Sequence, residues 1–362
     1  MKYSNVILKP DEKAVFSLRE LYLKYGYLHY KVGKFEEYDL YAGNKSFLIS
    51  DNILTFTDTN GKLMALKPDV TLSIVKNIGD DDTSMHKLFY NENVYRTSVS
   101  SGGFREIMQT GLECIGNIDT YSICEVLMLA LQSLQTIDKD SLLVLSHMGF
   151  TLGLLEACDF TAADTKEALG YIKSKNLQAI STLAAERGVR ADKAEALSFV
   201  TRFYGELSDA IEKIERFCFN ERMSEAYKEL CEINAAMKEK LYVDFSVVND
   251  MNYYDGIIFN GYVNGIPDSI LSGGRYDKLL SKMGKRAGAI GFAVYLDLLE
   301  RFESESTEYD VDVLLVYDEK CDASDVFLAQ REIVESGRTL KVSKCDDRSV
   351  KYREKITLAS GR

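Results

Sequence analysis

YNENVYRTSVSSGGFREIMQTGLECIG, residues Tyr90–Gly116, predicts two strands joined by a Ser/Gly-rich loop. The second strand carries Arg105, Gln109 and Glu113 at every fourth position. Side chains alternate between the two faces of a strand, so these three point the same way. Gly111 lies between two of them and leaves room above the sheet.

Two interpretations of this face remain open. Mixed charges are typical of a strand face that is exposed to solvent. Against this, Leu112, Cys114 and Ile115 indicate burial at the same end of the strand. A buried carboxylate such as Glu113 needs a partner, so the alternative is a face that holds a polar group in place.

Length and charge narrow the class of protein. The 362 residues predict two or three domains, and 46% hydrophobic residues are enough for a large core. The formal net charge of -12 argues against nucleic acid as the main partner, which normally needs a basic face. The N-terminal residues have no long apolar run, so we expect neither a signal peptide nor a membrane anchor.

Cysteine and histidine usage predicts a cytoplasmic protein without a metal site. The seven cysteines are scattered and form no C-x-x-C pair, as in cytosolic proteins with reduced thiols. The three histidines have no second histidine or cysteine at ligand spacing, so a zinc site is not expected.

Apolar periodicity predicts the elements of the first half of the chain. A helix is expected from Pro10 to Tyr25. Residues 54–67 predict a hairpin, in which Asn60-Gly61 supplies the positive φ angles of a tight two-residue turn. Further helices are expected after Pro68 and over 120–137.

The order of elements predicts an α+β protein with a mostly antiparallel sheet. The core is expected to span 1–305. Residues 149–241 are rich in Ala, Glu, Lys and Leu, lack proline and predict a helical insertion within that core. Residues 306–362 predict a short α/β tail of strand, helix and strand that becomes charged after Lys344.

Three further segments carry polar groups that bear on function. In ALKPDVT, Asp69 and Thr71 begin a helix, where they cap it or hold an ammonium group. In NYYDGIIF, the paired tyrosines Tyr253 and Tyr254 belong to the core or contact a ligand. In SGGRYDKLL, the glycines allow close approach of the backbone to a neighbour or ligand.

Taken together and in order, these segments resemble the class II synthetase core of histidyl-tRNA synthetase. The resemblance also includes YGYLHYKVGKFEEYDLY and GAIGFAVYLDLLER, and it spans roughly Met1 to Phe302. It implies a six- or seven-stranded antiparallel sheet flanked by helices, and a homodimer formed around the first segment.

The resemblance also implies a histidine pocket on the sheet face. Asp69, Thr71 and Gln109 would hold the α-amino end of the ligand, and Glu113 and Tyr254 would bond to its imidazole nitrogens. Carboxylates accept hydrogen bonds from ammonium and imidazole N–H groups, so this assignment is chemically sensible. Additional pocket or anion contacts are expected from a second group of residues: Arg96, Arg105, Tyr253, Gly274 and Arg275.

The chain departs from the synthetase pattern where ATP would bind. The family's Arg-x-Glu is Arg96-Thr97-Ser98 here, so the glutamate is missing. Asn249 and Leu298 stand where the family has arginines for the α-phosphate and the ATP tail. Losing one such donor typically lowers a rate about 10²–10³-fold. Gly33 replaces a proline, and the tail is about half of the family's anticodon-binding domain.

A chain with these departures resembles one group of synthetase paralogues, the regulatory subunits of ATP phosphoribosyltransferase. The resemblance implies a non-catalytic, cytoplasmic subunit of a hetero-oligomer that activates a short-form catalytic subunit in the first step of histidine biosynthesis. It implies L-histidine as the allosteric inhibitor, with no cofactor, nucleic acid or membrane partner. Two alternatives remain: a divergent or truncated histidyl-tRNA synthetase, and a nucleic-acid-binding or stress-sensing module of synthetase origin.

Overall fold

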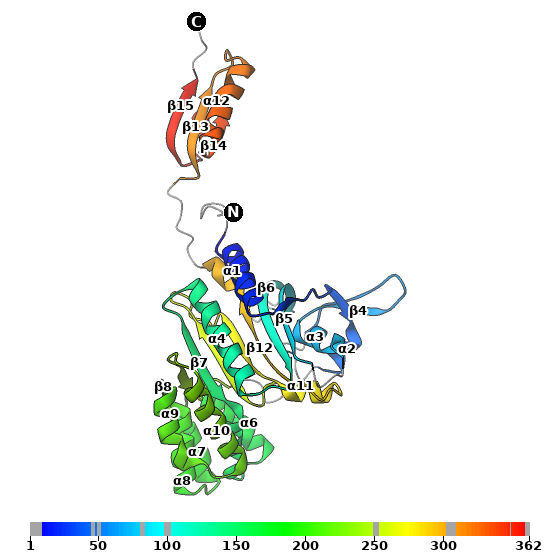
Figure 1. Ribbon diagram of the computed structural model, residues 1–362, viewed down its shortest axis with the longest axis vertical. Coiled ribbons are helices and arrows are strands. Elements are labelled where there is room, and N and C mark those ends of the chain that lie inside the picture. Colours follow the sequence, from blue (N-terminus) through cyan, green and yellow to red (C-terminus); the bar gives the residue numbers. More distant parts are fainter. Residues whose placement is uncertain are drawn as a thin grey trace. The chain divides into compact units, whose positions relative to one another are not determined.

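The computed structural model describes residues 9–44, 48, 52–79, 84–97, 103–248, 253–301, 309–347 and 349–358. The chain divides into two compact units, Met1–Phe302 and Glu303–Arg362. Figure 1 shows the helices and strands of both units. Within the described ranges, no helix combines the length and the apolar character that crossing a membrane requires.

The first unit is built on a mixed sheet, which has nine strands in the described part of the chain, in the order β1-β5-β6-β12-β11-β10-β7-β9-β8. Its strands are β1 (Leu28–His29), β5 (His86–Thr97), β6 (Phe104–Gly116), β7 (Leu142–His147), β8 (Tyr204–Glu206), β9 (Tyr242–Asp244), β10 (Ile257–Tyr262), β11 (Leu271–Arg275) and β12 (Gly288–Tyr295). The expected antiparallel strands form the centre. The predicted, mostly antiparallel sheet is confirmed, but it is larger than the six or seven strands expected, because β1 and β9 add parallel pairs and β8 adds an edge.

The long hairpin of β5 and β6 divides the sheet into two faces with different chemistry. Leu112 and Phe89 are paired in register and point toward α1 (Pro10–Lys24) and α4 (Thr120–Ile137). The ring of Tyr22 on α1 lies 5.8 Å from that of Phe89, and both are fully buried. Burying such side chains stabilises the fold by about 1.5–3 kcal/mol each. The alternate residues, including Glu113, therefore face the other side.

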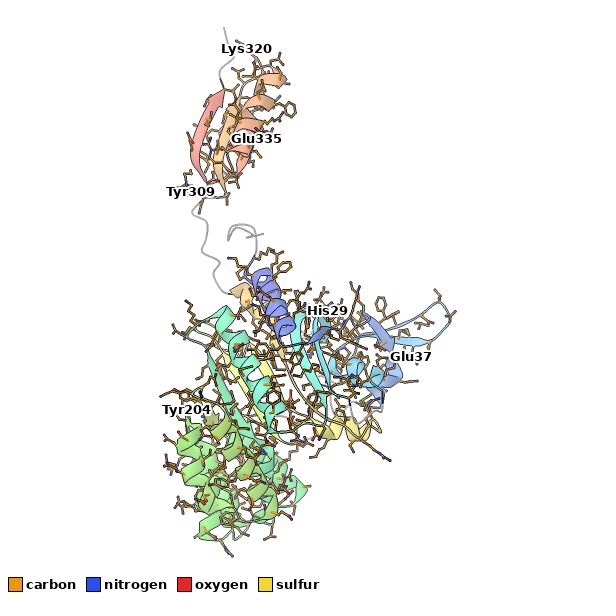
Figure 2. The ribbon with its side chains drawn as sticks, in the orientation of Figure 1. His29, Glu37, Tyr204, Tyr309, Lys320 and Glu335 are labelled. Carbon is orange, nitrogen blue, oxygen red and sulfur yellow. The ribbon has the colours of Figure 1, made fainter. Side chains whose placement is uncertain are left out.

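The edges of the sheet end in short, half-exposed strands. His29 on β1 lies beside α1, and its ring is 5.1 Å from that of Phe89 (Figure 2). At the other edge, Tyr204 on β8 stacks on Tyr242 with ring centroids 5.9 Å apart. Two- and three-residue strands carry too short a pattern to be recognised in a sequence, so the edges depend on tertiary pairing.

A second, small antiparallel sheet precedes the hairpin. It contains β2 (Phe35–Glu37), β4 (Leu63–Leu66) and β3 (Thr55–Thr57), and α2 (Tyr38–Ala42) and α3 (Thr71–Asn77) adjoin it in sequence. The predicted hairpin is confirmed, but its two-residue turn is not. Of the loop residues only Gly61 has a positive φ, 81°, and Asp58 Oδ1 accepts bonds from the backbone nitrogens of Asn60 and Lys62 at 2.8 Å. A longer loop of this kind needs a single left-handed residue.

The insertion consists mainly of helices packed around aromatic side chains (green in Figure 1). Its elements are α5 (Met148–Ala157), α6 (Ala162–Lys173), α7 (Leu177–Glu186), α8 (Ala191–Arg202), α9 (Leu207–Ile214), the 3-10 turn Glu215–Phe217 and α10 (Glu221–Ala236). Phe199, Phe203 and Phe245 are centred within 6.5 Å of one another. After α10 the chain returns to the sheet through β9, and α11 (Asp277–Lys282) and the 3-10 helix Leu296–Arg301 complete the unit.

The second unit is a three-stranded parallel sheet with one helix. Its elements are β13 (Val311–Tyr317), α12 (Ala323–Glu335), β14 (Leu340–Ser343) and β15 (Tyr352–Leu358), with β13 in the centre. Val313, Leu315 and Ile333 form its own small core. The sequence pattern missed β15, because three charged residues separate Tyr352 from Ile356, and Tyr352, Ile356 and Leu358 are only partly buried.

A buried ion pair joins the small sheet to the large one. Lys67 Nζ lies 2.6 Å from Glu92 Oε2, and the lysine side chain is 1% exposed. The other oxygen of Glu92 accepts a bond from Val32 N at 3.0 Å. The pair therefore holds the chain after β4 and the segment around Val32 against β5.

We expect Lys67→Met to lower the free energy of unfolding of the first unit by about 3–5 kcal/mol, since Glu92 would remain buried without its cation. Urea denaturation followed by circular dichroism measures this. The matched control is Lys62→Met, whose ion pair with Glu37 is 52% and 48% exposed, and which should change stability by about 0–1 kcal/mol. Equal losses in the two variants would contradict the structural role of Lys67.

Candidate functional site

The candidate site lies on the sheet face opposite α1 and α4, over β6, β12 and β11. Small residues occupy neighbouring positions there: Gly111 pairs with Ala293, and Gly291 pairs with both Glu113 and Gly274. A side chain on Gly291 would overlap the carboxylate of Glu113. The floor of the site is therefore glycine because a polar group needs the space above it.

Gly111 does not leave the opening that the sequence predicted. Tyr90 lies directly across from it on β5, and its buried ring covers the position where a side chain at 111 would begin. The glycine therefore makes room for a tyrosine of the protein itself. Tyr90 is a site residue that the sequence analysis missed.

Glu113 is the central group of the site. Its side chain is 2% exposed, accepts a 2.6 Å hydrogen bond from Thr71 Oγ1 and accepts another from the Tyr276 hydroxyl. Burial raises the pKa of Glu113 to about 8, although both hydroxyl donors favour the ionised form. At neutral pH much of this carboxyl group is protonated, and a cationic group beside it would ionise it.

Asp69 and Thr71, at the start of α3, make different contacts. Asp69 Oδ1 accepts a 2.8 Å bond from Leu72 N, so it caps the helix, whereas the Thr71 hydroxyl turns to Glu113. Burial raises the pKa of Asp69 and the charge of Arg96 opposes this. Arg96 Nε donates to Pro68 O at 2.9 Å, which ties the turn before α3 to β5.

Gln109 carries an unsatisfied polar group inside the site. It is 2% exposed, and its side-chain nitrogen is buried without a hydrogen-bond partner among the described residues. Leaving such a donor unpaired typically costs about 1–3 kcal/mol. A bound molecule that supplies an acceptor would recover this energy.

The two predicted tyrosines lie inside the cluster. The rings of Tyr253 and Tyr254 are 4.5 Å apart and nearly perpendicular, and Tyr253 is 5.9 Å from Tyr276. A Cβ atom on Gly274 would lie 2.7 Å from Tyr254 Cδ1, so this glycine admits the tyrosine ring. Tyr276, which donates to Glu113, therefore contacts Tyr253, which in turn contacts Tyr254.

Most of the predicted residues come together, and two arginines do not. Arg96 is buried near Asp69, whereas Arg105 is exposed at the outer end of β6. Arg105 lies four positions before Gln109, which is about 13 Å along a strand. Arg275 pairs with Asp277 at 2.9 Å and with Glu229 at 3.4 Å.

Tyr276 and Gly291 are the site residues whose signal was present in the sequence. Tyr276 follows Gly274 by two residues, so strand alternation places both on one face. Gly291 lies inside an apolar strand, where a glycine marks close approach of another group. Within the described residues, no group of three or more His, Cys, Asp or Glu side chains is placed to hold a metal ion.

The sheet is built on a long antiparallel hairpin and has helices on one face and this polar cluster on the other. These features define an α+β protein of the class II aminoacyl-tRNA synthetase fold. Solved structures agree. A protein described as an ATP phosphoribosyltransferase regulatory subunit/histidyl-tRNA synthetase from Bacillus halodurans superposes with a TM-score of 0.74 at 22% identity, over 96% of this chain and 93% of its own. Histidyl-tRNA synthetase from Nostoc sp. PCC 7120 gives 0.71 at 15% identity, over 96% and 86%.

The family model described as histidyl-tRNA synthetase matches residues 8–299. The chain belongs to this family. ATP phosphoribosyltransferase regulatory subunits are among its relatives: that of Clostridium kluyveri is 28% identical over 91% of this chain and 88% of its own length. That of Oceanobacillus iheyensis is 27% identical over 87% and 80%. A chain of the ATP phosphoribosyl transferase (HisG:HisZ) complex from Thermotoga maritima superposes with a TM-score of 0.61 at 20% identity, over 79% and 97%.

The structure bears on one of the three predicted departures from synthetase chemistry. Leu298, in the place of the arginine expected at the ATP tail, is partly buried and packs against the hydrophobic core. Ser98 and Asn249 lie outside the described residues.

The raised pKa of Glu113 predicts a specific dependence of stability on pH. The folded chain binds this proton more tightly than the unfolded chain, so the stabilisation is complete below the usual value of 4.5 and is lost as the pH rises toward about 8. Relative to Glu113→Gln, the wild type should lose free energy of unfolding across this window. Urea titrations at a series of pH values test this, and a difference that stays constant with pH would contradict it.

The lack of space at Gly291 predicts a second effect. Gly291→Ala should lower the free energy of unfolding by about 1–3 kcal/mol, since the new methyl group overlaps Glu113 and the Leu112 carbonyl. The control is Gly170→Ala on helix α6, where no atom lies within 4 Å and alanine favours the helix. Thermal melts compare the two, and a neutral Gly291→Ala would show that the floor has spare room.

Proposed function

We propose that this chain is the regulatory subunit of an ATP phosphoribosyltransferase. It activates a short-form catalytic subunit and confers feedback inhibition by L-histidine on the first step of histidine biosynthesis. The chain itself performs no chemistry, acts in the cytoplasm and has L-histidine as its ligand. Its family and the names of its relatives support this assignment.

One observation carries the ligand assignment: Glu113 is a buried carboxyl group that accepts hydrogen bonds from the hydroxyls of Thr71 and Tyr276 and has no cationic partner among the described residues. Burial raises its pKa to about 8. An imidazole has an ordinary pKa of about 6.5, so it exchanges a proton readily with such a group. Tyr254 would bond to the second ring nitrogen. A ligand whose side chain is neutral and has no titratable ring would leave Glu113 without such a partner.

The other end of the ligand would meet Asp69, Thr71 and Gln109. The carboxylate of Asp69 would accept from the α-ammonium group, and Arg96 lies close enough to influence the same carboxylate. The unpaired amide nitrogen of Gln109 would donate to the ligand carboxylate. A pocket with few converging polar groups on a rigid sheet is selective for a small molecule.

Inhibition requires that histidine bind the inactive arrangement of the complex better than the active one. A ligand with equal affinity for both would shift nothing. The coupling needed is typically about 1–3 kcal/mol. The homodimer around the first segment is part of this proposal, and it would cover the exposed apolar side chains of Leu28 and Phe35, which are 67% and 55% exposed.

A divergent histidyl-tRNA synthetase is the alternative that the family membership itself favours. It requires ATP-pyrophosphate exchange with histidine. The apolar packing of Leu298 counts against it, because a leucine cannot neutralise a phosphate. An exchange assay separates the two functions directly.

The decisive experiment measures phosphoribosyl-ATP formation by the short-form catalytic subunit of the same organism. Added chain should stimulate the reaction, and L-histidine should reverse the stimulation. Glu113→Gln should raise the histidine concentration needed for half inhibition at least about tenfold, the equivalent of ~1.4 kcal/mol, and leave activation within about twofold.

The control is Glu106→Gln on the same strand, an exposed residue whose carboxylate bonds to Asn93 and Tyr95. It should change neither activation nor inhibition. Absence of any stimulation by the wild type would overturn the regulatory function. Activation and inhibition falling together in Glu113→Gln would make the pocket purely structural.

A further inference from the structure

Glu229, on helix α10 of the insertion, contacts two residues of the sheet. Its Oε1 lies 3.1 Å from His147 Nε2, and its Oε2 lies 3.4 Å from Arg275 Nη1. The glutamate side chain is 21% exposed and that of His147 is 6% exposed. One largely buried carboxylate therefore joins the insertion to the ends of β7 and β11.

His147 connects this carboxylate to the start of the insertion. Its Nδ1 accepts a bond from Phe150 N at 3.4 Å and caps α5, so the ring proton is on Nε2 and is donated to Glu229. The backbone after His147 is fixed as well, because Met148 N donates to Gly256 O at 2.9 Å. Gly256 follows the tyrosines of the candidate site by two residues.

Arg275 connects the same carboxylate to the candidate site. Its Nε donates to Asp277 Oδ2 at 2.9 Å, and Asp277 Oδ1 accepts from Ala289 N at 2.8 Å. The next residue, Tyr276, donates its hydroxyl to Glu113. A shift of the Arg275 side chain therefore occurs one residue away from Tyr276, whose hydroxyl bonds to the carboxyl group of Glu113.

The charges explain why Glu229 holds this position. Burial opposes its ionisation, but the hydrogen bond from His147, together with the charge and hydrogen bond of Arg275, keeps the pKa of Glu229 below its usual value. A partly buried charged pair is sensitive to the loss of one partner. At 3.4 Å the contact with Arg275 is longer than the 2.7–2.9 Å typical of a charge-assisted bond, so small movements strengthen or weaken it.

We propose that Glu229 is a positioning residue that couples the ligand pocket to the helical insertion. It anchors Arg275 and thereby sets Tyr276 against Glu113. This inference rests on the proposed function, since it concerns the pocket that takes histidine. Coupling is reciprocal, so a ligand held by Glu113 and Tyr276 tightens α10 and α5 on the sheet. The insertion is then the part of the chain that responds to the ligand.

Two measurements on the full chain test this. Calorimetric titration with L-histidine should give a dissociation constant at least about fivefold higher for Glu229→Gln than for the wild type. Hydrogen exchange followed by mass spectrometry should show that histidine protects the amides of Glu221–Ala236 in the wild type and protects them less in the variant. The control is Glu195→Gln, a carboxylate of the same insertion whose ion pair with Arg216 is 56% and 62% exposed.

The outcomes separate this inference from the proposed function. A wild type that binds no histidine overturns both. A wild type that binds histidine without any change of exchange in α10, or a Glu229→Gln variant with unchanged affinity, overturns the coupling alone. Should Glu229→Gln fail to fold by circular dichroism, Arg275→Lys tests the same contact from the sheet side, and the exchange experiment on the wild type needs no variant.

Discussion

A carboxyl group buried in the middle of an antiparallel strand is the constraint on which this structure depends. Glu113 is kept out of water, and the fold around it supplies two hydroxyl donors and a glycine opposite. The same burial raises the pKa of Glu113. Such a group is expensive to bury unless it is neutralised or hydrogen-bonded. Helix α3, strand β12 and the end of β11 each provide one part of that environment.

The two faces of the same strand, β6, have different roles. Leu112 and its neighbours across the sheet pack against α1 and α4 and stabilise the core. The alternate residues carry groups that the core does not need, including a buried amide nitrogen on Gln109 without a partner in the described chain. A fold selected for stability alone has no use for such a donor, so its retention points to a ligand.

Binding a small molecule and activating ATP place different demands on one fold. The pocket requires oxygen atoms and tyrosines around a small ligand, and these are grouped over the central strands. Adenylation requires cations placed where phosphate charge develops, and at one such position the chain has a leucine packed into the core. The proposed regulatory function would use the first set of residues and would not need the second.

The sequence by itself determined the central hairpin, the helices before and after it in the chain and the common face of Gln109 and Glu113, because periodicity along a helix or strand is a local property. The grouping of Asp69, Thr71 and Tyr254 with these two residues followed only from the resemblance to the synthetase family. Tertiary structure alone decided the remainder. The strands β1, β8 and β9 gain their places by pairing with distant partners, and Tyr90 fills the space beside Gly111 because it lies across the ladder. Arg275 faces Glu229 because an insertion far away in the chain returns to the sheet. Contacts of this kind depend on packing between distant segments, and no periodicity along the chain encodes them.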